Sequence, residues 1–254
     1  VSPADVSARA RKIAEESGTA FLQYYGDLTS RMDASAMNAE EVKLSAAMKP
    51  ALLEVMKENN CTAGAFECWS AFPSLIGVCP CVVADEGYPL ACENDINGAV
   101  TLAILQACNL YKEPPFLADL TIRHPENDNA ELLWHCGPFP YSLKAEESKA
   151  RLVDGQERFE LKQGHITTCR FDDAEGRYYL FAGEGDTTRG PETNGTYTYL
   201  EVDDWKRWEE KLMFGPYIHH LGCVYGSYKE VLQEAARYLG IIFDDASVPG
   251  VSSL

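Results

Sequence analysis

The chain has 254 residues, of which 46% are hydrophobic and 11% aromatic, and its formal net charge is −17 at pH 7. This composition predicts a folded protein with a substantial core and excludes a disordered or fibrous chain. The negative charge argues against nucleic acids and membrane surfaces as partners, because both are themselves anionic, and no apolar run reaches the roughly 18–20 residues that span a bilayer.

The N-terminal part of the sequence predicts an α/β pattern. Ser2 is a favourable N-cap with Pro3 at the first helical position, so a first helix is expected to run to about Tyr25. Asn38 and Glu41 have the spacing of a capping box at the start of a second helix. The further elements expected here are a short β segment at 61–69, a short helix and loop at 73–87, a strand at 87–93, a helix at 95–110 and a strand at 115–121.

From about residue 130 the pattern changes to short β-prone segments separated by turn signals, which indicates an antiparallel barrel or sandwich. Two helices follow, and then a tail that is expected to be loose. The Gly-rich segment 183–195 lacks the helix and the Lys of a phosphate-binding loop, so it is expected to be a long loop at the rim of a site. The expected strands are 130–136, 148–155, 158–164, 165–172, 177–185 and 195–203, the expected helices are 203–213 and 227–240, and the expected tail is 244–254.

Nine cysteines are present, an odd number, and they are scattered along the chain. Only Cys79 and Cys81 lie close together, as CxC rather than CxxC, and no second pair stands at the spacing of a zinc ribbon. This pattern predicts free, buried thiols in a reducing, cytoplasmic protein.

Two carboxylates flank the helix expected at 95–110. Glu93 closes the preceding strand, and Asp119 lies near the end of the following strand. Strands joined by a helical crossover are normally parallel neighbours, so both side chains are expected at the same edge of a sheet, where open α/β sheets bind ligands. The alternative is ordinary helix capping and surface solvation, although Asp95 or Asn94 is the better N-cap, which leaves Glu93 unexplained by capping.

Three histidines add nitrogen ligands to these carboxylates. His135 lies on an apolar strand that runs into a Gly/Pro loop, a position that a hydrogen-bonded core histidine also occupies. His219 and His220 are adjacent, and alternation along a strand sends only one of them toward a given site. Two carboxylates with one or two imidazoles make an oxygen-rich site that suits Mn²⁺ or Mg²⁺ better than structural zinc. The remaining two, His124 and His165, stand near turns and are expected at the surface.

Several motifs together resemble a known family. They are "CENDINGA" from Cys92, "LADLT" from Leu117, "LWHCGPFP" from Leu133 and the His-His pair before the last helix. Over about residues 40–244 the chain resembles the C-terminal half of the L-fucose isomerase-like family and, more distantly, L-arabinose isomerases. The resemblance implies that residues 1–115 are the end of a Rossmann-like α/β domain. Residues 116–254 would be an antiparallel β-barrel-like C-terminal domain with terminal helices, in a chain that is the C-terminal part of a longer enzyme.

In that family an ene-diol mechanism interconverts an aldose and a ketose at a Mn²⁺ ion. The resemblance implies that Glu93 and Asp119 bind the metal and that one of these carboxylates is the base. His220 matches the third metal ligand. Mn²⁺ is therefore the expected cofactor, with Mg²⁺ or another divalent cation as the alternative, and a monosaccharide is the expected substrate.

The resemblance also implies residues that contact the sugar. His135 matches a further ligand or substrate contact, and His219 stands where the family has Asn or His. Trp69 falls in the matching Cys-Trp segment and is expected near the sugar. A homo-oligomer (trimer or hexamer), or association with the missing N-terminal part, is implied as well. A non-catalytic sugar-binding subunit and a related metal-dependent sugar epimerase stay open as alternatives.

Overall fold

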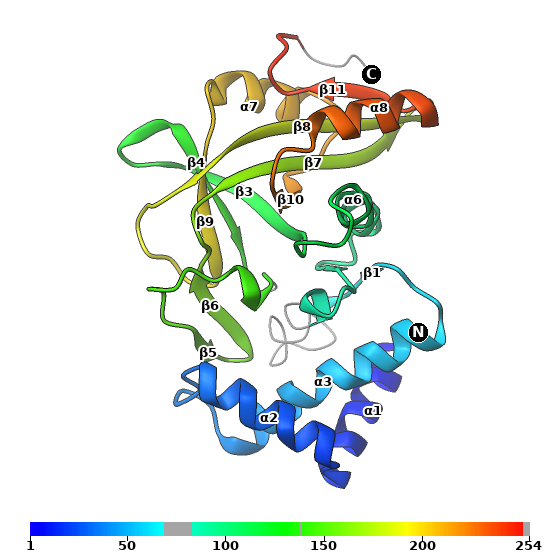
Figure 1. The fold of residues 1–254 in the computed structure, drawn as a ribbon, viewed down its shortest axis with the longest axis vertical. Coiled ribbons are helices and arrows are strands. Elements are labelled where there is room, and N and C mark those ends of the chain that lie inside the picture. The colour runs from blue at the N-terminus through cyan, green and yellow to red at the C-terminus, as the bar shows by residue number, and fades with distance from the viewer. Residues whose placement is uncertain (69–82, 138, 251–254) are drawn as a thin grey trace.

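The computed structural model describes residues 1–68, 83–137 and 139–250. A β-barrel forms one half of the molecule, and three N-terminal helices lie at the opposite end (Figure 1). The helical elements are α1 (Pro3–Glu16), α2 (Thr19–Arg31), α3 (Ala39–Glu58), α6 (Ile96–Cys108), the 3₁₀ helix η1 (Tyr141–Leu143), α7 (Trp205–Phe214) and α8 (Lys229–Leu239). The strands are β1 (Gly64–Ala65), β2 (Leu90–Ala91), β3 (Phe116–His124), β4 (Asn127–His135), β5 (Arg151–Val153), β6 (Gln156–Glu160), β7 (His165–Ala174), β8 (Arg177–Thr188), β9 (Thr196–Glu201), β10 (His220–Tyr225) and β11 (Ile242–Asp245).

The barrel contains six strands in the order β8-β7-β10-β3-β4-β9, and β9 pairs with β8 to close the ring. Every pair in this ring is antiparallel. The sequence left a barrel and a sandwich open, and the structure shows the barrel. Closure removes the free edges that an open sheet would expose, so the barrel wall is a rigid frame for side chains that project from its strands.

The expected parallel pairing of the strands on either side of α6 is wrong. β2 pairs in parallel with β1, in a sheet of only two strands. β3 belongs to the barrel and lies antiparallel between β10 and β4. The described residues before 116 therefore contain helices and one small parallel sheet. The Rossmann-like character of this part and the domain division at residue 115 stay predictions.

Cap chemistry explains the N-terminal helices. Ser2 accepts the N–H of Ala4 as expected, but the first helix ends at Glu16 rather than near Tyr25. Ser17 adopts a left-handed conformation (φ 49°), which ends α1 and lets α2 begin. The capping box before α3 is confirmed, with reciprocal hydrogen bonds of 3.0 and 3.1 Å between Asn38 and Glu41.

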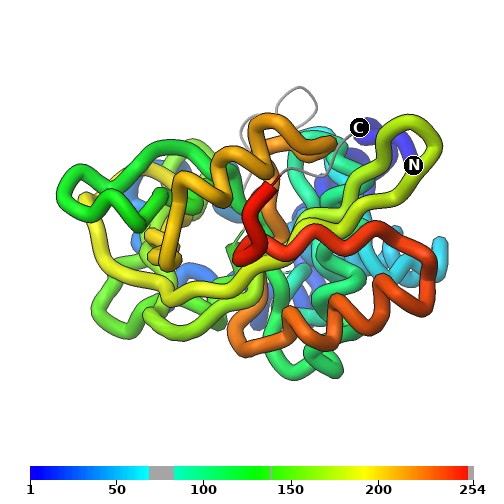
Figure 2. Tube along the Cα trace, turned by 90° about the horizontal axis from the view of Figure 1, so that it is seen from above, coloured from blue at the N-terminus to red at the C-terminus, as the bar shows by residue number. Residues whose placement is uncertain are grey.

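Two expectations near the C-terminus need correction. The first half of the loop expected at 183–195 is strand, because β8 continues to Thr188. The tail expected to be loose includes part of β11, which pairs in parallel with β8 and runs between α7 and α8 when seen from above (Figure 2). Of the apolar positions of α8, Leu232 and Ala236 are buried, whereas Val231 and Leu239 are 50% and 71% exposed.

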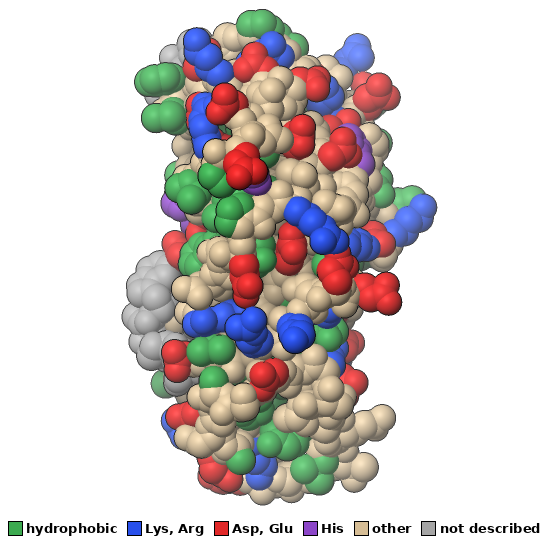
Figure 3. Space-filling view, turned by 90° about the vertical axis from the view of Figure 1, so that its left-hand side faces the viewer, with side chains coloured by type: hydrophobic (Ala, Val, Ile, Leu, Met, Phe, Trp, Pro, Cys, Tyr) green, Lys and Arg blue, Asp and Glu red, His purple; other side chains and the backbone are tan. Residues whose placement is uncertain are grey.

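The surface and the thiols agree with the composition. Acidic and basic side chains are interspersed over the face seen in Figure 3. Every cysteine in the described ranges is a free thiol. A helix long and apolar enough to cross a bilayer is not found in the described part of the chain.

Helix α6 packs directly on the barrel wall through Gly222 of β10. A Cβ at Gly222 would lie 2.5 Å from Thr101 Cγ2 and 3.0 Å from Leu105 Cδ1, so only glycine admits the helix at this distance. The Thr101 hydroxyl accepts the N–H of Phe171 on β7 at 2.9 Å. These contacts hold the middle of α6 against β10 and β7, and the first turn of the helix lies toward the candidate site.

We expect Gly222→Ala to lower the free energy of unfolding by about 1–3 kcal/mol, because the added methyl group must displace α6 or its side chains. Denaturant titration followed by circular dichroism measures this. The matched control is Gly26→Ala on α2, where a Cβ meets nothing within 4 Å, and this change should stabilise the helix by about 0.5–1 kcal/mol. Equal stability of Gly222→Ala and the parent chain would contradict the close packing of α6.

Candidate functional site

Three of the side chains predicted from the sequence meet where the turn after β2 approaches strands β3 and β10. His220 lies directly opposite Asp119 in the register of β10 and β3. Its Nε2 is 3.4 Å from Asp119 Oδ1 and 3.5 Å from Glu93 Oε2. The structure thus brings Glu93, Asp119 and His220 together, although by a different route from the parallel sheet expected.

The two other predicted histidines lie at the edge of this group. His219 Nε2 is 3.9 Å from Asp119 Oδ1, and its side chain is 61% exposed where that of His220 is 5% exposed. His135 Nε2 lies 3.8 Å from the same Asp119 oxygen, in a fully buried position. The predicted Trp69 falls outside the described residues.

Glu93 occupies a strained turn rather than the end of a strand. Glu93 and the following Asn94 both have left-handed backbone conformations (φ 62° and 55°), which side chains other than glycine rarely adopt. The N–H of Asn94 donates to the carbonyl of Phe66 at 3.1 Å, which holds the turn against the chain after β1. Such strain is typical of positions where a side chain must be aimed into a site. Here it directs the Glu93 carboxylate toward His220.

Buried polar atoms in this group lack partners. Asp119 Oδ1, His135 Nε2 and His220 Nε2 are all buried and have no hydrogen-bond partner among the described residues. Native proteins rarely leave buried polar atoms unsatisfied. Donor atoms that are 3.4–3.9 Å apart leave room for a cation with metal–ligand bonds of roughly 2.0–2.2 Å. The group Asp119, His219 and His220, with Glu93 beside it, therefore fits a divalent cation.

Asp95 has a role that the sequence did not reveal. Its Oδ1 caps α6 by accepting the N–H of Gly98 at 2.8 Å, as expected of an N-cap. Its Oδ2 accepts a hydrogen bond from His220 Nδ1 at 2.9 Å. This bond places the proton of His220 on Nδ1, so that the lone pair of Nε2 faces Glu93 and Asp119. A carboxylate behind a histidine is the usual support of a metal-binding imidazole.

A buried arginine holds Asp95 in turn. Arg170 is 1% exposed, binds both oxygens of Asp95, and donates from Nε to Asp172 at 2.8 Å. Asp172 also accepts from Asn97 Nδ2 at 2.6 Å, which ties β7 to the first turn of α6. Burial alone would raise the pKa of Asp95, but the hydrogen bonds from His220 and Arg170 hold that pKa well below its usual range. Asp95 is therefore ionised at neutral pH.

The environments of the other groups shift their pKa values in opposite directions. Burial, with the charge of Glu93, raises the pKa of Asp119 to about 6. Burial lowers the pKa of His135 to about 4, so its ring is neutral. Burial lowers the pKa of His220, but the carboxylates of Asp95, Asp119 and Glu93 outweigh this effect and raise that pKa above its ordinary value. This cluster attracts positive charge, whether a proton or a metal ion.

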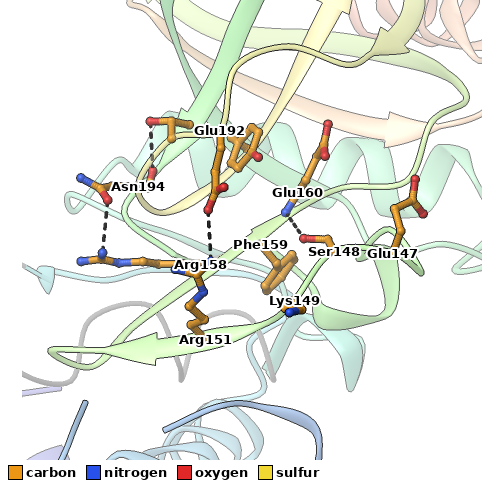
Figure 4. Close-up of a pocket in the computed structure, with 11 residues that line it drawn as sticks. Glu147, Ser148, Lys149, Arg151, Arg158, Phe159, Glu160, Glu192 and Asn194 are labelled. Carbon is orange, nitrogen blue, oxygen red and sulfur yellow. Dashed lines mark hydrogen bonds and ion pairs between the residues drawn. The ribbon is translucent and has the colours of Figure 1, made fainter. Parts of the chain in front are cut away.

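A separate pocket of about 280 Å³ lies over β5, β6 and the loop before β9 (Figure 4). Its charged side chains are partly paired: Arg151 donates to Glu192 at 3.3 Å, and Arg158 donates to the side-chain Oδ1 of Asn194 at 3.2 Å. Neither Asp119 nor His220 lines it. This pocket is thus distinct from the carboxylate–histidine group.

Comparison with known proteins gives the following. Residues 153–246 match the family "L-fucose isomerase, C-terminal domain". Over 206 residues the chain is 30% identical to a sulfoquinovose isomerase of Alkalicoccus urumqiensis, covering 76% of this chain and 45% of that protein. Over 218 residues it is 28% identical to a sulfoquinovose isomerase of Priestia megaterium, covering 80% of this chain and 48% of that protein. The chain spans about half the length of the curated relatives it matches.

These matches confirm the resemblance to the L-fucose isomerase-like family that the sequence motifs indicate.

Proposed function

We propose that the chain is the C-terminal part of a metal-dependent sugar isomerase, which interconverts an aldose and a ketose through an ene-diol. Glu93, Asp119 and His220 would hold a divalent cation, with Mn²⁺ favoured by two carboxylates and one imidazole, and Mg²⁺ as the alternative. The observation that supports this most strongly is the convergence of three buried, unpartnered polar atoms beside Glu93.

The side chains suit proton transfer next to a carbonyl group. When bound, the cation would stabilise negative charge on the sugar oxygens as a Lewis acid. Glu93 is the better candidate for the base, because its side chain is 40% exposed and open to a sugar, whereas that of Asp119 is 11% exposed. Glu93 would take the proton from one carbon and return it to the neighbouring carbon. A well-placed general base contributes roughly 10²–10⁴-fold to the rate.

The remaining predicted residues are proposed to orient the sugar. His219 is exposed beside the cluster, where a sugar hydroxyl can reach it. His135 Nδ1 accepts the backbone N–H of Cys136 at 2.9 Å, so its proton is assigned to Nε2, which faces Asp119. The relatives make sulfoquinovose one candidate substrate. We also propose that the half of the relatives without a counterpart here, or a second copy of the chain, completes the wall of the site.

The metal site is tested by titrating the purified chain with Mn²⁺. We expect one ion per chain, and we expect His220→Ala and Asp119→Asn to weaken binding by about 100-fold or more, since each removes a ligand. His165→Ala is the control, because this histidine is exposed and contacts Asp186 instead. If the parent chain and His220→Ala bind Mn²⁺ equally, the assignment of ligands is wrong.

The reaction is tested by NMR in D₂O with sulfoquinovose, L-fucose, L-arabinose and D-arabinose. We expect deuterium to enter at the carbon beside the carbonyl of one of these sugars, and Glu93→Gln to slow this exchange by about 10²–10⁴-fold. Undiminished exchange in Glu93→Gln would contradict its role as base. Metal binding without any exchange would instead favour the sugar-binding subunit.

The support of His220 is tested by Asp95→Asn. Asn still caps α6, but it lacks the charge that holds the His220 proton on Nδ1, so we expect Mn²⁺ affinity to fall by roughly 10–100-fold. Asp172→Asn is the matched control, because it removes the other partner of Arg170 without touching His220. Similar losses of affinity in both variants would show that Arg170, rather than the Asp95–His220 bond, determines metal binding.

A further inference from the structure

Three thiols meet next to the candidate active site, and each comes from a different segment. Cys68 follows β1, Cys92 follows β2 directly, and Cys136 follows β4 directly. Cys68 lies near enough to interact electrostatically with both of the other thiols. The cluster therefore lies between the small parallel sheet and the barrel, and it is independent of the three ligands proposed for Mn²⁺.

An imidazole completes this group. The ligand atoms of Cys92, Cys136 and His135 all lie within 4.8 Å of one another. His135 Nδ1 is 3.1 Å from Cys136 Sγ. Both Cys68 and Cys92 are almost fully buried, with exposures of 1% and 0%. Three sulfur atoms and one imidazole nitrogen thus converge in an interior position.

This is the donor set of a tetrahedral structural zinc site. Zinc–sulfur bonds of about 2.3 Å and zinc–nitrogen bonds of about 2.0–2.1 Å place the four donor atoms roughly 3.3–3.8 Å apart. For Cys92, Cys136 and His135, the observed spacing of up to 4.8 Å is compatible with that geometry after side-chain rotations. Cys68, which interacts with both thiols, is the nearby candidate for the fourth donor. Sulfur-rich sites select Zn²⁺ over Mn²⁺ and Mg²⁺, which prefer oxygen. The two neighbouring clusters therefore suit different metals.

We propose that Cys68, Cys92 and Cys136 bind one Zn²⁺ through sulfur, with His135 Nδ1 as the fourth ligand. The thiols give up their protons to water as the metal–sulfur bonds form. His135 Nδ1 gives up its hydrogen bond from the backbone N–H of Cys136 and binds the metal instead, while the proton of the ring stays on Nε2.

Zinc at this position would hold the Glu93–Asn94 turn against the barrel. Cys92 directly precedes Glu93, so anchoring its sulfur limits movement of the strained Glu93–Asn94 turn. The Nε2–H of a zinc-bound His135 points at Asp119 Oδ1, now 3.8 Å away and without a partner. A metal-bound imidazole that donates to a carboxylate is a common arrangement. His135 would thus connect the structural zinc to Asp119, one of the proposed ligands of the catalytic ion.

The test uses Co²⁺ as a spectroscopic substitute for Zn²⁺. The purified chain is treated with a chelator and a thiol reductant, freed of both, and titrated with Co²⁺ in the absence of oxygen. We expect one tightly bound ion per chain with strong sulfur-to-cobalt absorption and the visible bands of tetrahedral cobalt, all lost on adding Zn²⁺. The protein as purified should carry about one zinc per chain by elemental analysis.

Variants locate the ion. Cys92→Ala and Cys136→Ala should abolish the sulfur-to-cobalt absorption, whereas Cys223→Ala, another fully buried free thiol, should retain it. His220→Ala should also retain it while losing Mn²⁺ binding, so failure of this inference and failure of the proposed isomerase site are distinguishable. A folded parent chain without sulfur-to-cobalt absorption overturns the zinc site, and so does unchanged absorption in Cys92→Ala. If a cysteine variant fails to fold, the presence or absence of sulfur-to-cobalt absorption in the folded parent chain decides whether the zinc site exists.

Discussion

The carboxylate of Asp95 is the contact on which the arrangement of the site depends. One oxygen accepts a hydrogen bond from the N–H of Gly98 at the start of α6, and the other accepts one from Nδ1 of His220 on β10. Both oxygens also bind Arg170 on β7. A buried charge is tolerated only when it is paired and hydrogen-bonded on all sides, as this one is. The same group therefore caps the start of a helix, orients an imidazole and neutralises the buried guanidinium of Arg170.

Local sequence signals made many of the helices and strands predictable, whereas the pairing of the strands could not be predicted from them. The capping box of α3 and the turn-bounded strands of the barrel depend on neighbouring residues, so the sequence contains the information directly. β2 has two residues, too few for a pattern that identifies its partner. The reasoning that placed Glu93 and Asp119 at one edge of a parallel sheet failed for this reason. The two carboxylates still meet, because β10 carries His220 to a position opposite Asp119.

The supporting residues of the site were missed because their contacts are long-range. Asp95 has an obvious local role as a helix cap, and nothing nearby in sequence points to His220. Arg170 offers a usable signal, since a charged residue in the apolar strand "HITTCRF" must find an opposite charge if it faces inward. The thiol cluster has no such signal, because Cys68, Cys92 and Cys136 lie far apart along the chain and have none of the usual zinc-ligand spacings.

The separation of these residues also has a consequence for the order of folding. Asp95 and His220 are 125 positions apart, and contacts between distant residues form late because a long loop must close first. A chain that has folded only as far as β9 contains Asp95 and Arg170 but has no imidazole opposite Asp119. A cation at this site would therefore recognise the completed barrel alone, and it would stabilise the native state without assisting any earlier one.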